Sequence, residues 1–289
     1  MTFGKDLTKI NEAIELFKQG WEYKDLAAKY GVTTQTIGRI FKKYNIKESD
    51  NYKWVNSTYF DVIDTEEKAY LLGFFIADGC VREEFDKRYK GTNRLRMCLS
   101  NSIDNKEIIE LLHKKICPNN KLLWRHNTKG AKNRKPQLIV QWTSNHMSNI
   151  LINKYKILPK KTYDLNFKFP FETIPESLHR HFIRGFIDGD GAISLDGLRF
   201  CFNSELFLEQ IMNIFINFFK NNNLEFHYTK RLEKGKTVDI WKAFIAKGNH
   251  EKQQLLKDFL YKDATVYLTR KYNKIQLWKT KKIGRPKKS

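Results

Sequence analysis

Two nine-residue segments of the chain, LLGFFIADG at residues 71–79 and IRGFIDGDG at residues 183–191, nearly repeat one another. Each is an apolar stretch with a glycine at its third position and an Asp-Gly pair at its end. The partial negative charge at a helix C-terminus disfavours a carboxylate, so we expect a positive group to compensate each aspartate. Two such ends brought together would place like charges side by side, which favours a divalent cation between them. The repeat therefore predicts a metal site at a pseudo-twofold axis.

The repetition extends over most of the chain. The final aspartates of the two motifs are 112 residues apart, which leaves room for one small α+β unit to be repeated. Further stretches match in the same order. RMCLSNS at 96–102 matches RFCFNS at 199–204, and each is followed by an expected amphipathic helix, at 107–116 and 206–219. Hairpin-like stretches then follow at 122–141 and 225–246, Asn-His pairs at 145–146 and 249–250, and the similar segments LPKKTY at 158–163 and LTRKY at 268–272. A repeated unit of this kind indicates duplication.

Each half is expected to run in the order helix, two strands, helix, two strands, helix. We therefore predict an α+β fold of two pseudo-symmetric αββαββα halves, at residues 58–168 and 169–278. The first two matched stretches are nine residues further apart in the first half than in the second. This difference predicts a longer early hairpin in the first half, around residues 83–93.

The charge balance narrows the class of partner. The 289 residues include 53 Lys and Arg against 32 Asp and Glu, for a net charge of +21. Such a surplus is typical of proteins that bind a polyanion, and nucleic acid is the best-supported partner. The apolar runs are too short to span a bilayer and no secretory segment is evident, so we expect no membrane partner. The four cysteines are scattered without a CxxC pair, which favours neither a disulfide framework nor a zinc site and fits a reducing cytoplasm.

Residues 1–46 are predicted to form a small all-α domain of three helices. Small Ala27 and the turn residue Gly31 follow a spacing that resembles a helix-turn-helix of the resolvase or transposase type. Thr33 or Thr34 would cap the second helix of this motif. The polar face of that helix suits base edges and phosphates, and the residues expected to contact DNA are Thr34, Gln35, Thr36, Arg39 and Lys42. An ordinary three-helix packing unit is the alternative.

The paired segments and the shared order of elements resemble the single-chain LAGLIDADG homing endonucleases, over about residues 58–275. In that family the two motif helices pack together at the centre, and their last acids bind the divalent metals that cleave both DNA strands. The resemblance implies that Asp78 and Asp190 are the catalytic metal ligands, with Gly79 and Gly191 beside them in the metal site. The third-position glycines would let the two helix backbones approach closely. Gly79 and Gly191 suit a turn that ends each helix.

The chemistry implied by this resemblance is phosphodiester hydrolysis. A metal held by carboxylates can activate the attacking water, stabilise the pentacoordinate phosphate and neutralise the leaving oxygen. Mg²⁺ is the expected ion because it is hard and prefers oxygen ligands, and Mn²⁺ is expected to substitute for it. The motifs differ at one position, where the second has Asp188 and the first has Ile76. We expect this difference to make the two halves unequal in strand cleavage.

Family members place a basic residue near the scissile phosphate, late in each half. Lys161 follows Asp78 by 83 residues and Lys271 follows Asp190 by 81, so these lysines are the catalytic candidates for positioning water or stabilising the transition state. Solvent-facing lysines are the alternative. Asn101 and Asn203 occur where the family often uses a supporting polar residue, although the match between these two asparagines is offset by one position.

In the family the four strands of each half form a concave sheet in the major groove, so the two halves are expected to form a DNA-binding saddle. Polar and basic strand residues are the candidate base readers: Arg94, Arg96, Arg125, Gln137, Gln141, Arg199, Tyr228, Lys230, Arg231 and Lys242. A polar linker is expected at 47–57 and a basic tail at 279–289. Within the tail, Gly284-Arg285-Pro286 is similar to the core of an AT-hook, which would lay Arg285 in the minor groove. A disordered phosphate-binding tail is the alternative.

Together these features predict a site-specific, metal-dependent endodeoxyribonuclease that cuts both strands of a double-stranded DNA target, as in intron homing. Because both halves are present in one chain, we expect it to act as a monomer. We expect a location in the cytoplasm, or in an organelle or a phage-infected host cell. Two alternatives keep the same fold: an intron maturase that binds RNA, and a regulator that binds DNA without cleaving it. Intact Asp78 and Asp190 favour the nuclease.

Overall fold

The computed structural model describes residues 3–18, 21–46, 55–85, 93–125, 135–195, 197–225, 228–234, 239–245 and 249–278. The expected linker at 47–57 lies largely outside these ranges, and the basic tail with Arg285 lies wholly outside them. Within the described ranges, no helix is long and apolar enough to cross a membrane.

The N-terminal residues form three α-helices around a hydrophobic cluster of their own. They are α1 Leu7–Lys18, α2 Tyr23–Tyr30 and α3 Thr34–Lys43, after a 3-10 turn at Phe3–Lys5. Ile10 and Phe17, which recur at helical spacing, are buried in this cluster. Gly31 ends α2 in the left-handed conformation, with a φ of 63°. Thr33 caps α3 by accepting a hydrogen bond from the Thr36 amide at 3.2 Å.

The rest of the chain folds as two halves with the same order of elements. The first contains α4 Glu66–Asp78, β1 Gly79–Phe85, β2 Asn93–Ser102, α5 Lys106–Ile116, β3 Leu123–Arg125, β4 Gln137–Thr143 and α6 Asn145–Asn149, which continues as a π-helix over Ile150–Lys154. The second contains α7 Glu176–Asp190, β5 Gly191–Ser194, β6 Gly197–Phe202, α8 Glu205–Asn221, β7 Tyr228–Glu233, β8 Ile240–Ile245, α9 His250–Tyr261 and α10 Thr269–Gln276. Short 3-10 helices lie at Ile103–Asn105, Lys161–Tyr163 and Phe171–Thr173. The predicted order of elements in each half is confirmed.

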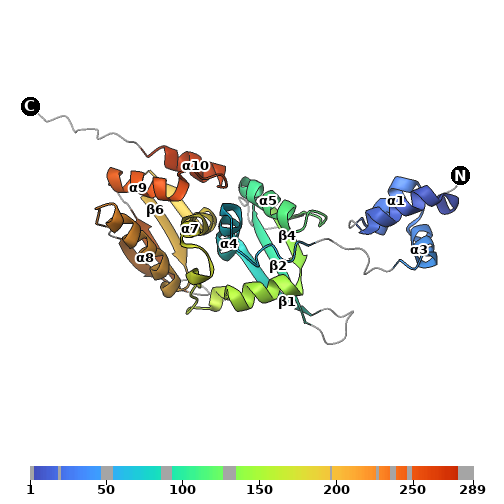
Figure 1. The fold of residues 1–289 in the computed structure, drawn as a ribbon, viewed down its shortest axis with the longest axis horizontal. Helices are drawn as coiled ribbons and strands as arrows, with labels where there is room; N and C mark the ends of the chain where they lie inside the picture. Colours follow the sequence, from blue (N-terminus) through green and yellow to red (C-terminus); the bar gives the residue numbers. More distant parts are fainter. Residues whose placement is uncertain are drawn as a thin grey trace, which may run out of the picture.

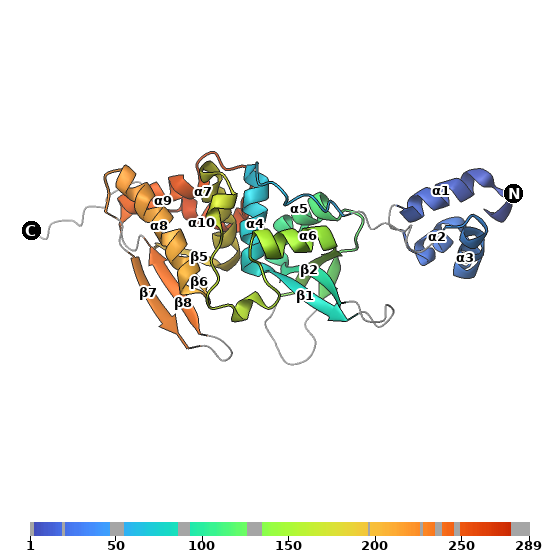
Figure 2. The ribbon, with the colours of Figure 1, turned by 60° about the horizontal axis from the view of Figure 1, so that its bottom comes forward.

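Each half contains one four-stranded antiparallel sheet, ordered β1-β2-β4-β3 in the first half and β5-β6-β8-β7 in the second. Helices cover one face of each sheet (Figure 1, Figure 2). We call the other face the open face. The first hairpin is longer in the first half, as predicted, since β1 has seven residues and β5 has four.

The two early hairpins also differ in register. The sequence match aligns Leu99 with Phe202, and it aligns Gly79 with Gly191. In the structure Gly79 pairs with Leu99, whereas Gly191 pairs with Phe200. The second hairpin is therefore shifted by two residues relative to the first, so matched residues of β2 and β6 do not occupy equivalent places beside the motif helices.

The motif helices α4 and α7 pack side by side between the two sheets (Figure 1). A Cβ atom added to Gly73 would lie 2.0 Å from the carbonyl oxygen of Phe182, and one added to Gly185 would lie 2.0 Å from that of Tyr70. Both motifs therefore need glycine at the third position, because backbone meets backbone there. The apolar residues of both helices belong to one continuous core that extends through the two halves.

Gly79 and Gly191 are needed because a side chain at either position would clash with its surroundings, and not because the backbone forms a left-handed turn. Their φ angles are −81° and −87°, and each helix passes directly into a strand in an extended conformation. A Cβ atom at Gly79 would lie 2.3 Å from the Phe75 ring, and one at Gly191 would lie 2.4 Å from the carbonyl oxygen of Ile187. The expectation of a glycine turn at these helix ends is therefore wrong, because the following strand begins at the glycine itself.

A buried ion pair joins the two halves. Arg184 of α7 is fully buried, and its guanidinium donates to the Glu66 carboxylate of α4 at 2.6 Å. The same guanidinium donates to the carbonyl oxygens of Leu260 at 2.8 Å and Val266 at 3.0 Å. Glu66 also accepts a hydrogen bond from the Val266 amide at 3.1 Å. Because every charged group in this network has partners, it can remain ionised inside the protein.

Candidate active site and nucleic-acid surface

Asp78 and Asp190 are the last residues of α4 and α7, and these two helix ends lie next to each other. A Cβ atom added to Gly189 would lie 3.1 Å from the Oδ2 atom of Asp78. Burial raises the pKa of Asp190 to about 7, and the neighbouring Asp78 carboxylate adds to this rise. Burial also raises the pKa of Asp78, while Lys161 and Lys271 oppose that rise. The structure thus brings together the two aspartates that the sequence repeat selects.

Two lysines supply the positive charge that the helix ends require. The Lys161 ammonium donates to the Ala77 carbonyl at 3.1 Å and to other carbonyls in the last turn of α4. The Lys271 ammonium donates to the carbonyls of Ile187 at 2.7 Å and Gly191 at 2.6 Å, where α7 ends. Burial lowers the pKa of each lysine to about 8, and the nearby aspartates oppose this change. The two ammonium groups are therefore not solvent-facing, which removes that alternative.

Asn101 and Asn203 lie in different environments. The Asn101 side-chain amide donates to the Oδ2 atom of Asp78 at 2.6 Å. The Asn203 amide instead donates to the backbone carbonyls of Lys161 at 3.1 Å and Asp164 at 2.9 Å. Within the described part of the chain, no side chain donates a hydrogen bond to the Asp190 carboxylate. The site is therefore asymmetric around its two carboxylates.

Asp188 does not join the pair of motif aspartates. Its fully buried carboxylate accepts hydrogen bonds from the Tyr70 hydroxyl at 2.8 Å, the Tyr261 hydroxyl at 2.9 Å and the Leu268 amide at 2.8 Å. Ile76, at the matching position of the first motif, packs in the hydrophobic core. The difference between the motifs therefore lies in the interior packing behind the site and does not change the pair of aspartates at the helix ends.

The oxygen donors at this site fit a hard divalent cation. Among the described residues, no group of three or more His, Cys, Asp and Glu side chains converges as a metal site. The candidate donors are the carboxylates of Asp78 and Asp190 and the carbonyl oxygens beside them. The Gly191 carbonyl already accepts a hydrogen bond from Lys271, which leaves it one lone pair. Mg²⁺ and Mn²⁺ accept a coordination shell that has few protein oxygens and is completed by water and phosphate.

Two cysteines face each other directly after Asp78. Cys80 in β1 is the cross-strand partner of Cys98 in β2. The Arg82 side chain donates to the Cys80 sulfur at 3.2 Å. Hydrogen bonding by Cys98, and then by Arg82, lowers the pKa of Cys80 to about 6, although burial opposes this. Cys201, which matches Cys98 in sequence, instead has its sulfur 3.9 Å from the Asp190 carbonyl oxygen.

Strand register places the candidate base readers of the first half on the open face. Met97 of β2 and Val140 of β4 belong to the core, so the residues that alternate with them face the other way. By this register the open face carries Arg96, Arg125, Gln137 and Gln141. Arg96 forms an ion pair with Glu84 at 2.8 Å across the β1–β2 hairpin. Arg94 belongs to β2, but its side chain lies outside the described part of the structure.

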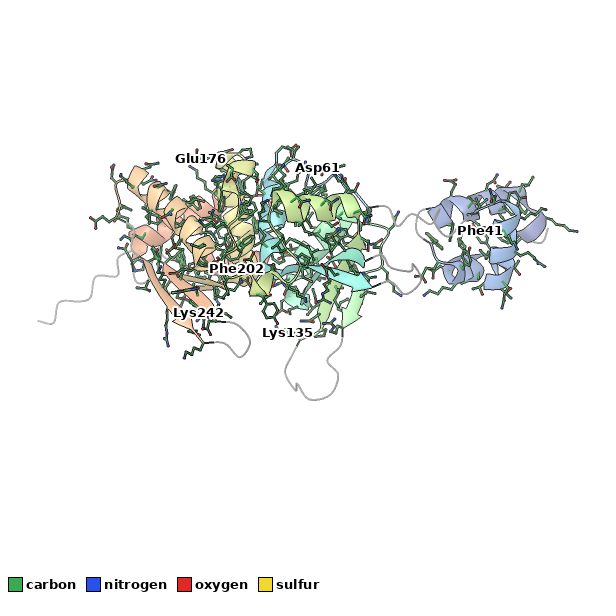
Figure 3. The ribbon with its side chains drawn as sticks, turned by 90° about the horizontal axis from the view of Figure 1, so that it is seen from below. Phe41, Asp61, Lys135, Glu176, Phe202 and Lys242 are labelled. Atoms are coloured by element: carbon green, nitrogen blue, oxygen red, sulfur yellow. The ribbon has the colours of Figure 1, made fainter. Side chains whose placement is uncertain are left out.

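The same reasoning applies to the second half. Ala243 and Ile245 of β8 belong to the core, so the residues that alternate with them, and the cross-strand partners of those residues, define the open face. By this register the open face carries Arg199, Arg231 and Lys242. Lys242 also forms an ion pair with Glu233. Figure 3 shows Lys242 and Glu176 on opposite sides of the molecule. Glu176 is the first residue of the motif helix α7.

The expectation that Tyr228 and Lys230 read bases is wrong. They alternate with Arg231 in β7 and therefore point toward the helix-covered face. The Lys230 ammonium binds the Glu209 carboxylate of α8 at 2.8 Å and also the Glu205 carboxylate. Tyr228 packs against the hydrophobic core. Lys230 therefore links β7 to α8, and Tyr228 belongs to the packed face of the sheet. The sequence did not reveal this, because composition does not determine the register of an edge strand.

On α3 the predicted DNA-contacting face is largely exposed. Ile37 and Phe41 are buried in the N-terminal cluster, which turns the opposite side of the helix to solvent. The exposed candidates on that side are Thr34, Gln35, Arg39 and Lys42. Thr36 is half-buried, and its hydroxyl lies 3.0 Å from that of Thr33 within the helix cap. Thr36 therefore contributes to the cap, and its role in contacting DNA stays a prediction.

Two features near the site were not predicted from the sequence. Arg82 lies on the open face beside the cysteine pair. The alternation of the buried Val81 with its polar neighbours could have placed Arg82 on that face. The pairing of Cys80 with Cys98 depends on the register of two strands, which the residue pattern alone does not determine.

Comparison with known proteins gives the following likenesses. No protein-family model matches the chain, and no curated protein sequence matches it significantly. Among solved structures, the chain is similar to mesophilic variants of the homing endonuclease I-DmoI, with 16% identity and a TM-score of 0.43 over 70% of this chain and 98% of that chain. It is similar to the meganuclease I-SmaMI bound to uncleaveable DNA, with 14% identity and a TM-score of 0.44 over 74% and 90% of the two chains. It is also similar to the LAGLIDADG meganuclease I-AabMI bound to uncleaved DNA, with 12% identity and a TM-score of 0.40 over 72% and 88%.

Proposed function

We propose that this chain is a site-specific, metal-dependent DNA endonuclease that cleaves both strands of a double-stranded target. The observation that carries the proposal is the juxtaposition of Asp78 and Asp190 at two adjacent helix ends. Each aspartate directly precedes the first strand of a sheet whose open face carries arginine side chains. One carboxylate per half gives each strand of a duplex its own hydrolytic centre.

The electrostatics of the aspartate pair support a bound dication. Burial and the Asp78 carboxylate together raise the pKa of Asp190, so two negative charges at this site are costly without a counter-ion. Mg²⁺ is the proposed ion, and Mn²⁺ is expected to replace it. When bound, the cation would make water a stronger nucleophile at neutral pH and offset the charge of the reacting phosphate.

Lys161 and Lys271 are proposed to position the two carboxylates. Each ammonium binds the terminal carbonyls of the helix whose last residue is a motif aspartate. This contact fixes the last turn and offsets the partial negative charge that a helix end would otherwise impose on Asp78 or Asp190. The lysines lie close enough to the carboxylates to change their pKa, so they also contribute positive charge where a phosphate would react. Asn101 adds a direct hydrogen bond to Asp78 alone.

The open faces of the two sheets are proposed to hold the DNA. A duplex carries closely spaced phosphates, and the side chains available to it on these faces include Arg96, Arg125, Arg199 and Arg231. The exposed face of α3 is proposed to provide a second contact with the duplex. A monomer is sufficient for these roles, because one chain contains both carboxylates and both sheets.

A maturase that binds RNA and a regulator that only binds DNA are the alternatives. The aspartate pair favours cleavage over either of them. Burial raises the pKa of both Asp78 and Asp190, so keeping two acids at adjacent helix ends is unfavourable for folding. A protein that only binds nucleic acid gains nothing from this arrangement, whereas a hydrolytic metal site requires it.

The decisive experiment is a cleavage screen with matched variants. The wild-type protein is incubated with Mg²⁺ and a plasmid library of random target sites, and cut sites are recovered by sequencing. Asp78→Asn and Asp190→Asn should each abolish cutting of one strand while DNA binding persists. Asp258→Asn, on the exposed side of α9, is the charge-matched control and should cut normally. Cleavage by the double variant would refute the proposal. DNA binding without any cut site would favour the regulator, and selective binding of intron RNA would favour the maturase.

A further inference from the structure

The open face of the first sheet carries two thiols directly opposite each other. Cys80 and Cys98 are Cα partners in the antiparallel β1–β2 ladder, and both are free. Directly opposite residues in such a ladder have Cα atoms about 4.5–5.5 Å apart and side chains on the same face. Disulfides span Cα separations of about 4.4–6.8 Å. The Cα separation expected for this pair therefore lies within the range that a disulfide spans.

We propose that Cys80 and Cys98 are a redox-active dithiol that a low-molecular-weight disulfide, such as oxidised glutathione, converts into an intramolecular disulfide. In the first step the Cys80 sulfur attacks the small disulfide, forms a mixed disulfide and releases one small thiol. In the second step the Cys98 sulfur attacks the Cys80 sulfur and releases the other. Two protein thiols are oxidised, and one small disulfide is reduced to two thiols, so atoms and electrons balance.

The positions of the four cysteines limit this reaction to one pair. Cys80 is partly exposed and can react with the small disulfide. Cys98 has an exposed fraction of only 6%, so it reacts in the second step with the Cys80 sulfur. Cys117 is fully buried in the core cluster. Cys201 faces Lys242 across the β6–β8 ladder, so it has no thiol opposite it on that side. Intramolecular exchange is therefore expected only between Cys80 and Cys98.

The location of the pair connects it to the proposed function. The next cross-strand pair on the same face is Arg82 with Arg96, and Asp78 lies two residues before Cys80. If the open face holds DNA, as proposed above, a bound duplex covers both thiols and should slow their oxidation. A disulfide would also tie the strand that follows Asp78 to the strand that carries Asn101.

The test counts thiols in the folded protein before and after treatment with oxidised glutathione, with the titration done after denaturation. The wild type has four cysteines and should fall from four free thiols to two. A tryptic digest without reductant should contain one cross-linked peptide that joins Cys80 to Cys98, because Arg82 and Arg96 provide cleavage sites between them. A reducing thiol should restore all four.

Single variants identify the partners. Cys98→Ser should stop at the mixed disulfide, with one glutathione retained on Cys80. Cys201→Ser is the matched control, because Cys201 aligns with Cys98 in sequence but lies beside Asp190, and it should lose two thiols like the wild type. Four free thiols after treatment, a cross-link between two chains, or loss of the reaction in Cys201→Ser would each overturn the proposal. Oxidation at an unchanged rate in the presence of saturating duplex DNA would count against the proposed DNA-binding face and leave the dithiol itself supported.

Discussion

Replacing Gly73 by alanine tests the close crossing of α4 and α7. The added Cβ would lie 2.0 Å from the Phe182 carbonyl oxygen, whereas real Cβ contacts essentially never fall below 3.0 Å. The helices must therefore separate by about 1 Å, from 2.0 Å to at least 3.0 Å at this contact. Neither the added Cβ, which is fixed to the α4 backbone, nor the backbone carbonyl of Phe182 can rotate away. Overpacking costs about 1–3 kcal/mol, and this site belongs at the upper end of that range. The better helix propensity of alanine returns about 1 kcal/mol.

The net expectation is a loss of about 2 kcal/mol, which lowers the melting temperature by about 4–8 °C in a domain of this size. DNA cleavage should fall more steeply than stability, because the same separation moves Asp78 away from Asp190. The measurements are thermal unfolding by circular dichroism and the rate of plasmid cutting at a temperature where both proteins are folded.

Two further variants make this prediction refutable. Gly185→Ala makes the reciprocal contact, at 2.0 Å from the Tyr70 carbonyl oxygen, and should destabilise the protein by a similar amount. Gly38→Ala in α3 places its Cβ 3.7 Å from the Tyr23 ring, an ordinary contact, and should leave the main melting transition unchanged. If Gly73→Ala melts and cuts DNA like the wild type, the backbone contact does not hold the carboxylates in place.

Three other predictions concern single side chains. Asn101→Ala should slow cutting of the strand served by Asp78 and leave the other strand unaffected, so nicked plasmid should accumulate; equal slowing of both strands would contradict this. The folded-state pKa of Asp190 is raised to about 7 from 3.8, so its contribution to stability is complete below about pH 4 and is lost as the pH rises through about 7. Metal-free melts should therefore show the wild type losing stability relative to Asp190→Asn over this pH window, and a constant difference would be inconsistent with the raised pKa. Arg231→Ala should weaken DNA binding and lower the salt slope by about 1, whereas Lys230→Ala should change neither in a salt-titrated binding assay.

The repeat predicted the architecture because duplication imposes the same constraints twice. Gly73 and Gly185 must be small because the backbones of the two motif helices meet there. Asp78 and Asp190 were expected to share one location because both would hold a metal. The need for positive charge at the helix ends was also visible in the sequence. Lys161 and Lys271 meet that need through hydrogen bonds to backbone carbonyls, a mode of contact that residue spacing does not specify.

Strand residues were harder to place, because a shift of one position exchanges the two faces of a strand. Tyr228 and Lys230 have side chains that suit DNA as well as Arg231 does, yet only Arg231 lies on the open face. Composition could not distinguish these residues. A lysine that binds two glutamates of α8 has the same side chain as a lysine that binds phosphate, so residue type alone does not tell which partner it has. In the first half the candidates Arg96 and Gln141 alternate with the core residues Met97 and Val140, and both lie on the open face.

The asymmetry of the site has a different source from the one that the sequence suggests. Asp188 and Ile76 differ between the motifs, but both are fully buried: Asp188 accepts a hydrogen bond from Tyr70, and Ile76 packs in the hydrophobic core. The different surroundings of Asp78 and Asp190 arise instead from the two-residue register shift between the early hairpins. That shift lets Asn101 reach Asp78 and places Cys201 beside Asp190. Unequal cleavage of the two strands should therefore respond to Asn101 and not to Asp188, since a change at Asp188 would destabilise both halves together.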